Sequence, residues 1–186
     1  MSKVFNEEDF NSGNGMITTV WGPPLWFSLH TMSFNYPVNP TKEQKQQYYA
    51  YFTSLKWTLP CKYCRENYTK NLKVLPLNKE ALKNRESFSR WLYNLHNMVN
   101  KNLGKENYKT YEEVRDMYEN FRARCTVNYK REETKEEDKI EKGCTEPLYG
   151  VKPKGVVAVM PYDRIIKNNE SIIVSEEVIK SKDKKL

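Results

Sequence analysis

Long apolar runs are missing from this chain of 186 residues, and no stretch approaches the roughly 20 consecutive apolar residues that would span a bilayer. The first 12 residues carry charges and no apolar run, so they do not resemble a secretory leader. We therefore expect a soluble, non-secreted protein with no membrane association. The length suits one domain of ordinary size with a substantial buried core.

Cysteine is scarce, with four residues in the chain. That number is too small for a secreted fold held together by disulfide bonds. Any disulfides are therefore expected to be catalytic or local staples, in a protein that belongs to a reducing compartment.

Dense basic clusters with interleaved aromatic residues are also missing, and so are nucleic-acid-binding motifs and internal repeats. The chain has 31 Lys and Arg against 24 Asp and Glu, a formal net charge of +7. Most of the excess lies in residues 1–125, which hold 18 basic and 12 acidic side chains. This modest excess suits a phosphate-bearing cofactor as well as any other anion, and we expect no nucleic-acid partner.

Histidine occurs twice, and both residues lie in short motifs on either side of Cys61-Lys62-Tyr63-Cys64. Alone, a Cys-x-x-Cys pair is ambiguous between a redox pair, half of a zinc site and a short structural disulfide. The flanking positions of His30 and His96 favour a dithiol site beside a bound aromatic cofactor.

Apolar spacing and capping signals predict five helices joined by short links, and hence an all-α helical bundle. The expected helices are residues 23–35, a second from the Thr41 capping box to just before Pro60, a third starting at Pro60, residues 87–103 followed by Gly104, and a short fifth after the Thr110 capping box. Cys61 would lie in the first turn of the third helix, where the helix dipole would lower the pKa of its thiol.

The character of the chain changes after Cys125. Residues 130–142 are almost all charged, which is typical of a solvated helix or a linker. Residues 155–160 and 171–175 have the composition of two short strands. We expect a helical domain in residues 1–125 and a charged C-terminal extension in residues 126–186.

Three motifs together resemble the Erv/ALR family of FAD-dependent sulfhydryl oxidases, in the family's order and near its spacing. They are Trp21-Gly22 with Trp26 and Leu29-His30, then Cys61-x-x-Cys64, then His96-Asn97-x-Val99-Asn100 followed by Leu103-Gly104-Lys105. The Lys- and Asn-rich sequence with Leu59-Pro60 before the cysteine pair resembles members encoded by large cytoplasmic DNA viruses.

The resemblance implies a four-helix bundle with a fifth short helix, bound FAD, and a homodimer. It implies that a dithiol and O2 become a disulfide and H2O2, with Cys64 beside the flavin and Cys61 receiving the incoming thiolate. The residues expected to bind FAD are Gly22, Trp26, His30, His96, Asn97, Asn100, Lys101 near the phosphates, Lys105 and Tyr118.

The same resemblance implies a protein thiol substrate or a thioredoxin-like relay protein as partner, and a place in the host cytoplasm or the virion. Cys125 and Cys144 form either a structural disulfide or a shuttle pair on a terminal extension. We favour the staple, because closing a loop of that size could contribute roughly 3 kcal/mol of stability.

Three other interpretations stay open. Cys61 and Cys64 could bind zinc together with Cys125 and Cys144, although eighteen residues separate the last two. The chain could be a non-enzymatic helical structural or interaction protein with a zinc or disulfide staple. A thioredoxin-like isomerase is disfavoured, because its cysteine pair should follow a strand. We expect no metal.

Overall fold

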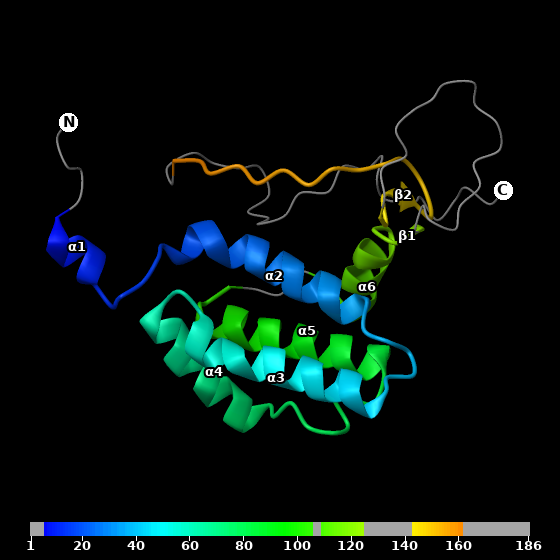
Figure 1. Ribbon diagram of the computed structural model, residues 1–186, viewed down its shortest axis with the longest axis horizontal. Helices are drawn as coiled ribbons and strands as arrows, with labels where there is room; N and C mark the ends of the chain where they lie inside the picture. Colours follow the sequence, from blue (N-terminus) through cyan, green and yellow to red (C-terminus); the bar gives the residue numbers. More distant parts are fainter. Residues whose placement is uncertain (1–5, 106–108, 125–142, 162–186) are drawn as a thin grey trace. The chain divides into compact units, whose positions relative to one another are not determined.

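The computed structural model describes residues 6–105, 109–124 and 143–161 (Figure 1). Within them the elements are α1 (Glu7–Asn11), α2 (Thr18–Phe34), α3 (Lys42–Thr58), α4 (Lys62–Val74), α5 (Arg85–Asn102), α6 (Tyr111–Glu119), β1 (Ala123–Arg124) and β2 (Glu146–Pro147). The expected helical fold is confirmed. The chain divides into two compact units, residues 1–107 and 108–186, which are described separately. The functional boundary expected at residue 125 stays a prediction. Among the described residues, no helix combines the length and apolarity needed to cross a membrane.

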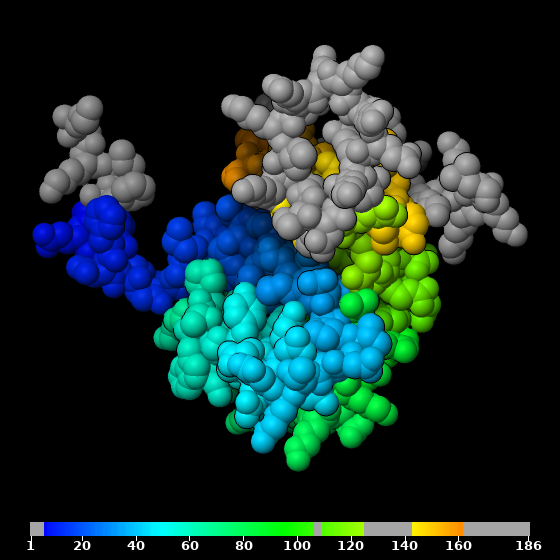
Figure 2. Space-filling model, turned by 45° about the vertical axis from the view of Figure 1, so that its right-hand side comes forward, coloured from blue at the N-terminus to red at the C-terminus, as the bar shows by residue number. Residues whose placement is uncertain are grey.

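Four helices of the first unit share one hydrophobic core, with α2 packed on α5 and α3 packed on α4. Figure 2 shows α3, in cyan, covering one face of this unit. The core cluster consists of Leu29, Tyr36, Phe52, Leu55, Leu59, Tyr68, Leu77, Leu82, Phe88, Trp91, Leu92 and Leu95. Each large apolar side chain contributes about 1.5–3 kcal/mol when buried fully. The two buried phenols are satisfied, because Tyr36 donates to the Leu82 carbonyl at 3.0 Å and Tyr68 to the Phe52 carbonyl at 2.8 Å.

Helix α2 begins at Thr18, five residues before the predicted start at Pro23. Proline is tolerated in a first turn but does not require one, and tertiary contacts extend this helix toward the N-terminus. The indole of Trp21 packs against the core, and its N–H donates to the Met16 carbonyl at 3.0 Å. These contacts hold the extra turn in place ahead of the two prolines.

The capping signals were reliable guides to the other helix starts. Thr41 and Thr110 both form the expected capping boxes, and their side chains accept the amide N–H of Gln44 and Glu113. Helix α5 begins at Arg85, two residues before the predicted start, because the Asn84 side chain caps it by accepting the Ser87 N–H at 2.9 Å.

The second unit contains α6 and a two-stranded antiparallel sheet in which Ala123 pairs with Pro147 and Arg124 with Glu146. The strand predicted at residues 155–160 is wrong: these residues form no strand, and their valines are exposed. An apolar run has strand propensity but needs a paired neighbour to become a strand, and the described residues provide none for it. The strand predicted at residues 171–175 lies outside the described residues.

Candidate active site

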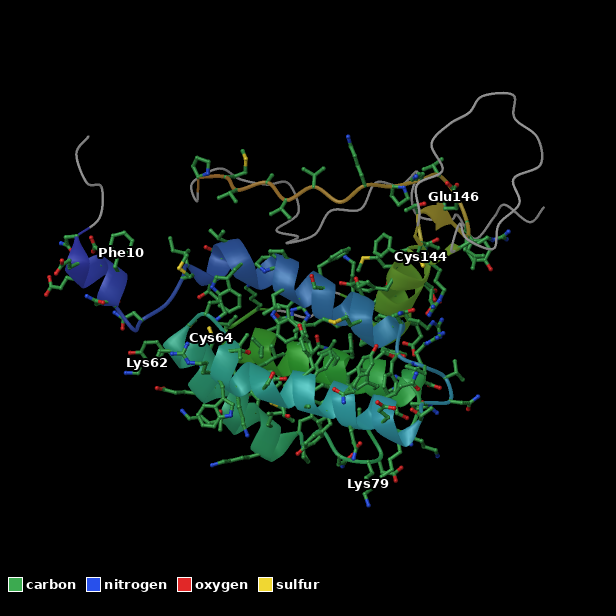
Figure 3. All side chains as sticks on the ribbon, in the orientation of Figure 1. Phe10, Lys62, Cys64, Lys79, Cys144 and Glu146 are labelled. Carbon is green, nitrogen blue, oxygen red and sulfur yellow. The ribbon has the colours of Figure 1, made fainter. Side chains whose placement is uncertain are left out.

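Cys61 is the N-cap of α4, which corrects the prediction that it lies in the first helical turn. Its backbone is extended, with φ −157° and ψ 125°, and its sulfur accepts the Cys64 N–H at 3.2 Å. Both cysteines are half-buried and in the free thiol form. Because α4 begins at Lys62, Cys64 lies in its first turn. This N-terminal end of α4 is close to the beginning of α2 (Figure 3).

The two thiols have opposite pKa shifts. Burial opposes ionisation of Cys61, but hydrogen bonds from the Cys64 side chain, the Cys64 and Tyr63 amides and the Thr18 hydroxyl outweigh it and lower its pKa. Burial, the hydrogen bond to Cys61 and the Cys61 charge raise the pKa of Cys64 to about 11. We therefore assign the first thiolate of the reduced pair to Cys61, in the direction predicted from its place at a helix start.

The two histidines meet on the facing sides of α2 and α5. His30 Nε2 and His96 Nδ1 lie 3.0 Å apart, so one ring donates its N–H to the other. The Trp26 ring stacks on His96 with centroids 4.0 Å apart and an interplanar angle of 7°. The fold therefore brings together three of the residues predicted to bind a cofactor.

Both imidazoles are neutral at ordinary pH. Burial, helped by the nearby His96, lowers the pKa of His30 to about 3. Burial and the positive charge of Lys105 lower the pKa of His96 to about 4. The cluster of Trp26, His30 and His96 is therefore flat, aromatic and uncharged.

Gly104 explains why Lys105 affects His96. Its φ of +67° is left-handed, a conformation that glycine adopts without a Cβ penalty. The reversed chain then satisfies the last turn of α5: the Gly104 N–H donates to Lys101 O at 3.1 Å and the Lys105 N–H to Asn100 O at 2.9 Å. The helix end thus carries two exposed lysines, Lys101 and Lys105, next to the histidine pair along the chain.

One face of α2 connects the cysteines to the histidines. Thr18, Gly22, Trp26 and His30 recur every four residues, so they lie along one side of the helix. Thr18 lies close enough to both cysteines to affect their pKa values, and His30 hydrogen-bonds to His96. At 1.5 Å per residue these two ends are about 18 Å apart, so a ligand that touches both must be elongated.

Gly22 is buried in the middle of this face, and the packing of the chain does not require a glycine there. A Cβ added to it would meet only Thr18 Cγ2, at an ordinary contact distance of 3.7 Å. Glycine inside a helix costs roughly 0.5–1 kcal/mol relative to alanine. Its missing side chain leaves the main chain of α2 bare between Thr18 and Trp26.

The remaining predicted residues are placed less tightly. Asn97 and Asn100 are half-buried in α5 beside this cluster in sequence. Tyr118 is buried in α6 of the second unit against Phe121, and its role in cofactor binding stays a prediction. Cys144 is exposed next to β2, whereas Cys125 lies outside the described residues. Within the described ranges, no three His, Cys, Asp or Glu side chains are grouped to hold a metal ion.

Two features around the cysteine pair have no signal in the sequence. The main chain of residues 14–16 runs antiparallel to residues 60–62, and Thr18 lies close enough to both cysteines to affect their pKa values. The dipeptide Asn14-Gly15 indicates a turn, but a turn signal does not say what the turn will contact.

Residues 23–122 match the model of the Erv1 / Alr family, which is more than half of the chain, and the chain belongs to this family. It is 42% identical over 86 residues to a probable FAD-linked sulfhydryl oxidase of Acanthamoeba polyphaga mimivirus, across 46% of this chain and 60% of that protein. It is 31% identical over 99 residues to the FAD-linked sulfhydryl oxidase of African swine fever virus, across 53% of this chain and 80% of that protein.

The chain spans less than two thirds of the length of some of the relatives that it matches. The FAD-linked sulfhydryl oxidase ERV1 of Arabidopsis thaliana is 36% identical over 84 residues, which are 45% of this chain and 42% of that protein. The crystal structure of the yeast Erv1 core superposes with a TM-score of 0.50 at 24% identity, across 63% of this chain and 92% of that one. This likeness supports the helical fold of the first unit.

Proposed function

We propose that the chain is an FAD-dependent sulfhydryl oxidase that converts protein dithiols to disulfides and reduces O2 to H2O2. One observation carries the proposal: a single face of α2 has the cysteine pair, in which the pKa of Cys61 is lowered, near one end and an uncharged aromatic cluster at the other. FAD is an elongated dinucleotide with a ring system at each end, which matches the separation of about 18 Å between them.

The residues on this face fit FAD in their chemistry. Trp26, His30 and His96 offer flat, neutral surfaces for stacking and ring nitrogens for hydrogen bonds. Gly22 lets a ligand approach the main chain, and Lys101 and Lys105 are exposed cations suited to phosphates. Asn97, Asn100 and Tyr118 complete the proposed set. When bound, FAD accepts an electron pair from a thiolate and passes it to oxygen.

Thiol exchange begins at Cys61 in the oxidised enzyme. A substrate thiolate attacks the Cys61 sulfur of the Cys61–Cys64 disulfide, forming a mixed disulfide and releasing Cys64 as a thiolate. The second substrate thiolate then attacks the first substrate sulfur, which closes the substrate disulfide and releases Cys61. Leaving-group thiols of lower pKa depart faster, so the lowered pKa of Cys61 favours this second step.

The raised pKa of Cys64 belongs to the fully reduced pair. Two of its causes are the hydrogen bond to Cys61 and the Cys61 charge. Neither cause acts while Cys61 is held in a mixed disulfide. The pKa of Cys64 is then lower than it is in the fully reduced pair. Once Cys61 is released and FAD is bound, Cys64 would be the residue that gives up the electron pair, and the Cys61 thiolate would close the Cys61–Cys64 disulfide. Two electrons and two protons would then leave the reduced pair in each cycle.

The partners follow from this chemistry. The proposed substrates are a protein thiol pair or a thioredoxin-like relay protein, together with O2. A homodimer and a place in the host cytoplasm or virion are proposed from the family resemblance.

An absorbance spectrum of the purified protein tests the proposal, together with oxygen consumption and peroxide formation in the presence of dithiothreitol. A yellow protein with a flavin spectrum, consuming about one O2 and forming about one H2O2 per dithiol oxidised, is expected from the reaction stoichiometry. A folded, colourless protein that takes up no FAD on reconstitution would instead favour a non-enzymatic structural role.

A further inference from the structure

Residues 14–16, a short segment ahead of α2, are hydrogen-bonded to the loop that carries Cys61. Gly15 and Cys61 form an isolated antiparallel bridge. Two main-chain hydrogen bonds flank it: the Met16 N–H donates to Pro60 O at 2.7 Å, and the Lys62 N–H donates to Asn14 O at 3.1 Å. The backbone on both sides of Cys61 is therefore tied to residues 14–16, which lie 46 positions earlier in the chain.

This contact requires glycine at position 15. Its φ is +108°, a conformation that L side chains rarely adopt. A Cβ there would lie 2.4 Å from Pro60 O and 2.8 Å from Cys61 Cα, and both are main-chain atoms that cannot turn aside. Gly13 offers a contrast two residues earlier, since a Cβ added to it would meet nothing within 4 Å.

The far end of the same segment is also anchored. Met16 O accepts the Trp21 indole N–H at 3.0 Å, and Trp21 packs against the core. The bridge thus fixes the backbone of Cys61 at the N-cap of α4, where its sulfur accepts the Cys64 N–H at 3.2 Å.

Charged groups do not cause the lowered pKa of the Cys61 thiol. Residues 12–22 contain no charged side chain. On α4, Lys62 is exposed and Arg65 Nη1 donates to Leu59 O at 2.7 Å, while on α3 the Lys56 ammonium lies over the Trp57 ring. None of these charges contributes to the pKa shift of Cys61, which comes from burial and from hydrogen bonds.

We propose that residues 14–16 form a clamp on the redox pair: the Gly15 bridge holds Cys61 at the N-cap of α4, where its sulfur accepts the Cys64 N–H and is stabilised as a thiolate. Gly15 is then a positioning residue. The inference rests on the proposed oxidase function for its consequence, but not for its geometry. Without the bridge, Cys61 becomes a poorer leaving group and oxidised substrate departs more slowly.

The first test measures the pH dependence of iodoacetamide alkylation at Cys61 in the reduced full-length protein, resolved by peptide mass spectrometry. Gly15→Ala should raise the midpoint by about one pH unit, the value of the Cys64 N–H hydrogen bond to the Cys61 thiolate. Gly13→Ala adds the same methyl group where nothing lies within 4 Å, and it should leave the midpoint unchanged. Equal midpoints for Gly15→Ala and the wild type would overturn the proposed effect of the bridge on the Cys61 sulfur.

The second test compares Gly15→Ala with Gly13→Ala by amide hydrogen exchange. Gly15→Ala should speed exchange at the Met16 and Lys62 amides by at least about tenfold, because both bonds of the bridge open. Gly13→Ala should not change it. Unchanged protection in a folded Gly15→Ala protein would overturn the positioning role.

Activity separates this inference from the proposed function. Neither alkylation nor hydrogen exchange requires FAD or turnover, so both tests remain decisive if the wild type proves inactive. If the wild type is active, the rate of flavin reduction by dithiothreitol under anaerobic conditions should fall about threefold in Gly15→Ala, as a Brønsted coefficient near one half implies. An active wild type with an unshifted alkylation midpoint in Gly15→Ala would refute the clamp and leave the oxidase assignment standing.

Discussion

His30 Nε2 and His96 Nδ1 form a 3.0 Å hydrogen bond between α2 and α5, although 66 positions separate the two residues in sequence. With burial lowering the pKa of His30 to about 3 and of His96 to about 4, both rings stay neutral, and one N–H is shared between them. The hydrogen bond would be lost if both rings were protonated, because neither nitrogen could then accept.

The first prediction is that the protein without cofactor loses stability as the pH falls from 6.5 toward 4. Above pH 6.5 the histidines are neutral in both the folded and the unfolded chain. Below it the unfolded chain binds protons that the folded chain does not, so the free energy of unfolding falls as the pH falls. At pH 5 the loss should be on the order of 2 kcal/mol per histidine. Urea unfolding between pH 7.5 and 5 measures it.

A chain without histidine is the control for this effect. His30 and His96 are the two histidines of the sequence, so His30→Gln/His96→Gln removes every imidazole. Its stability should vary much less over the same range. A variant with the wild-type slope would show that other groups cause the pH dependence.

The second prediction concerns the affinity for FAD. His96→Ala should weaken FAD binding by about tenfold or more, because it removes both the surface stacked on Trp26 and the partner of His30. Asn94→Ala changes an exposed residue of the same helix and should have no effect. Fluorescence titration of the apoprotein gives both affinities. Equal dissociation constants for the two variants would remove His96 from the site.

Gly22→Ala gives the third prediction, in which stability and affinity move in opposite directions. The added methyl group has room in the apoprotein, so the free energy of unfolding should rise by about 0.5–1 kcal/mol through helix propensity. FAD affinity should fall by about tenfold, as expected when a methyl group enters a close contact. Calorimetry and titration measure the two effects. Improved stability with unchanged affinity would mean that FAD does not approach Gly22.

Fourth, each cysteine of the pair should be essential in a different way. Cys64→Ser should abolish dithiothreitol oxidation, since no thiolate remains to reduce the flavin. Cys61→Ser should abolish it too, but should leave Cys64 able to give a long-wavelength charge-transfer band. That band should strengthen with pH, and at a lower pH than the raised pKa of about 11 implies, because the contribution of Cys61 is gone. A band in the Cys64 variant alone would reverse the two assignments.

The fifth prediction separates a staple from a shuttle at the distal cysteines. Arg124, the residue before Cys125, pairs with Glu146, two residues after Cys144. We therefore expect Cys125→Ser/Cys144→Ser to lower the thermal midpoint, because the free energy of unfolding falls by up to roughly 3 kcal/mol in the chain-entropy treatment. Turnover of dithiothreitol should change little. Unchanged stability with failed oxidation of a folded protein substrate would indicate a shuttle. A trapped mixed disulfide between Cys61 and a distal cysteine would do the same.

The features that the sequence predicted well are those fixed by local interactions. Thr41 and Thr110 cap their helices through residues three positions away, and Gly104 ends α5 within one turn. The motif residues Trp26, His30 and His96 could be named from the resemblance alone, and the structure brings them into one cluster.

The features that it missed depend on contacts between distant segments. Nothing in the pattern around Gly15 indicates that its backbone pairs with Cys61, because main-chain hydrogen bonds leave no side-chain signature. The early start of α2 depends on the packing of Trp21. Residues 155–160 form no strand because the part of the chain that the structure describes offers them no paired neighbour. Propensity describes a segment alone, whereas these outcomes depend on its neighbours.

The pairing of α2 with α5 also has a consequence for how the first unit folds. Helices α3 and α4 are joined by three residues and form a hairpin whose contacts close a short loop. Helices α2 and α5, which pack on each other, are the first and last of the four core helices in sequence. Distant contacts carry the larger loop-closure entropy and form only when most of the chain is ordered. A ligand held by His30 and His96 binds the completed fold alone and stabilises it by mass action. Release of the ligand and cooperative unfolding should therefore coincide. The α3–α4 hairpin, in contrast, can form before the rest of the fold and without the ligand.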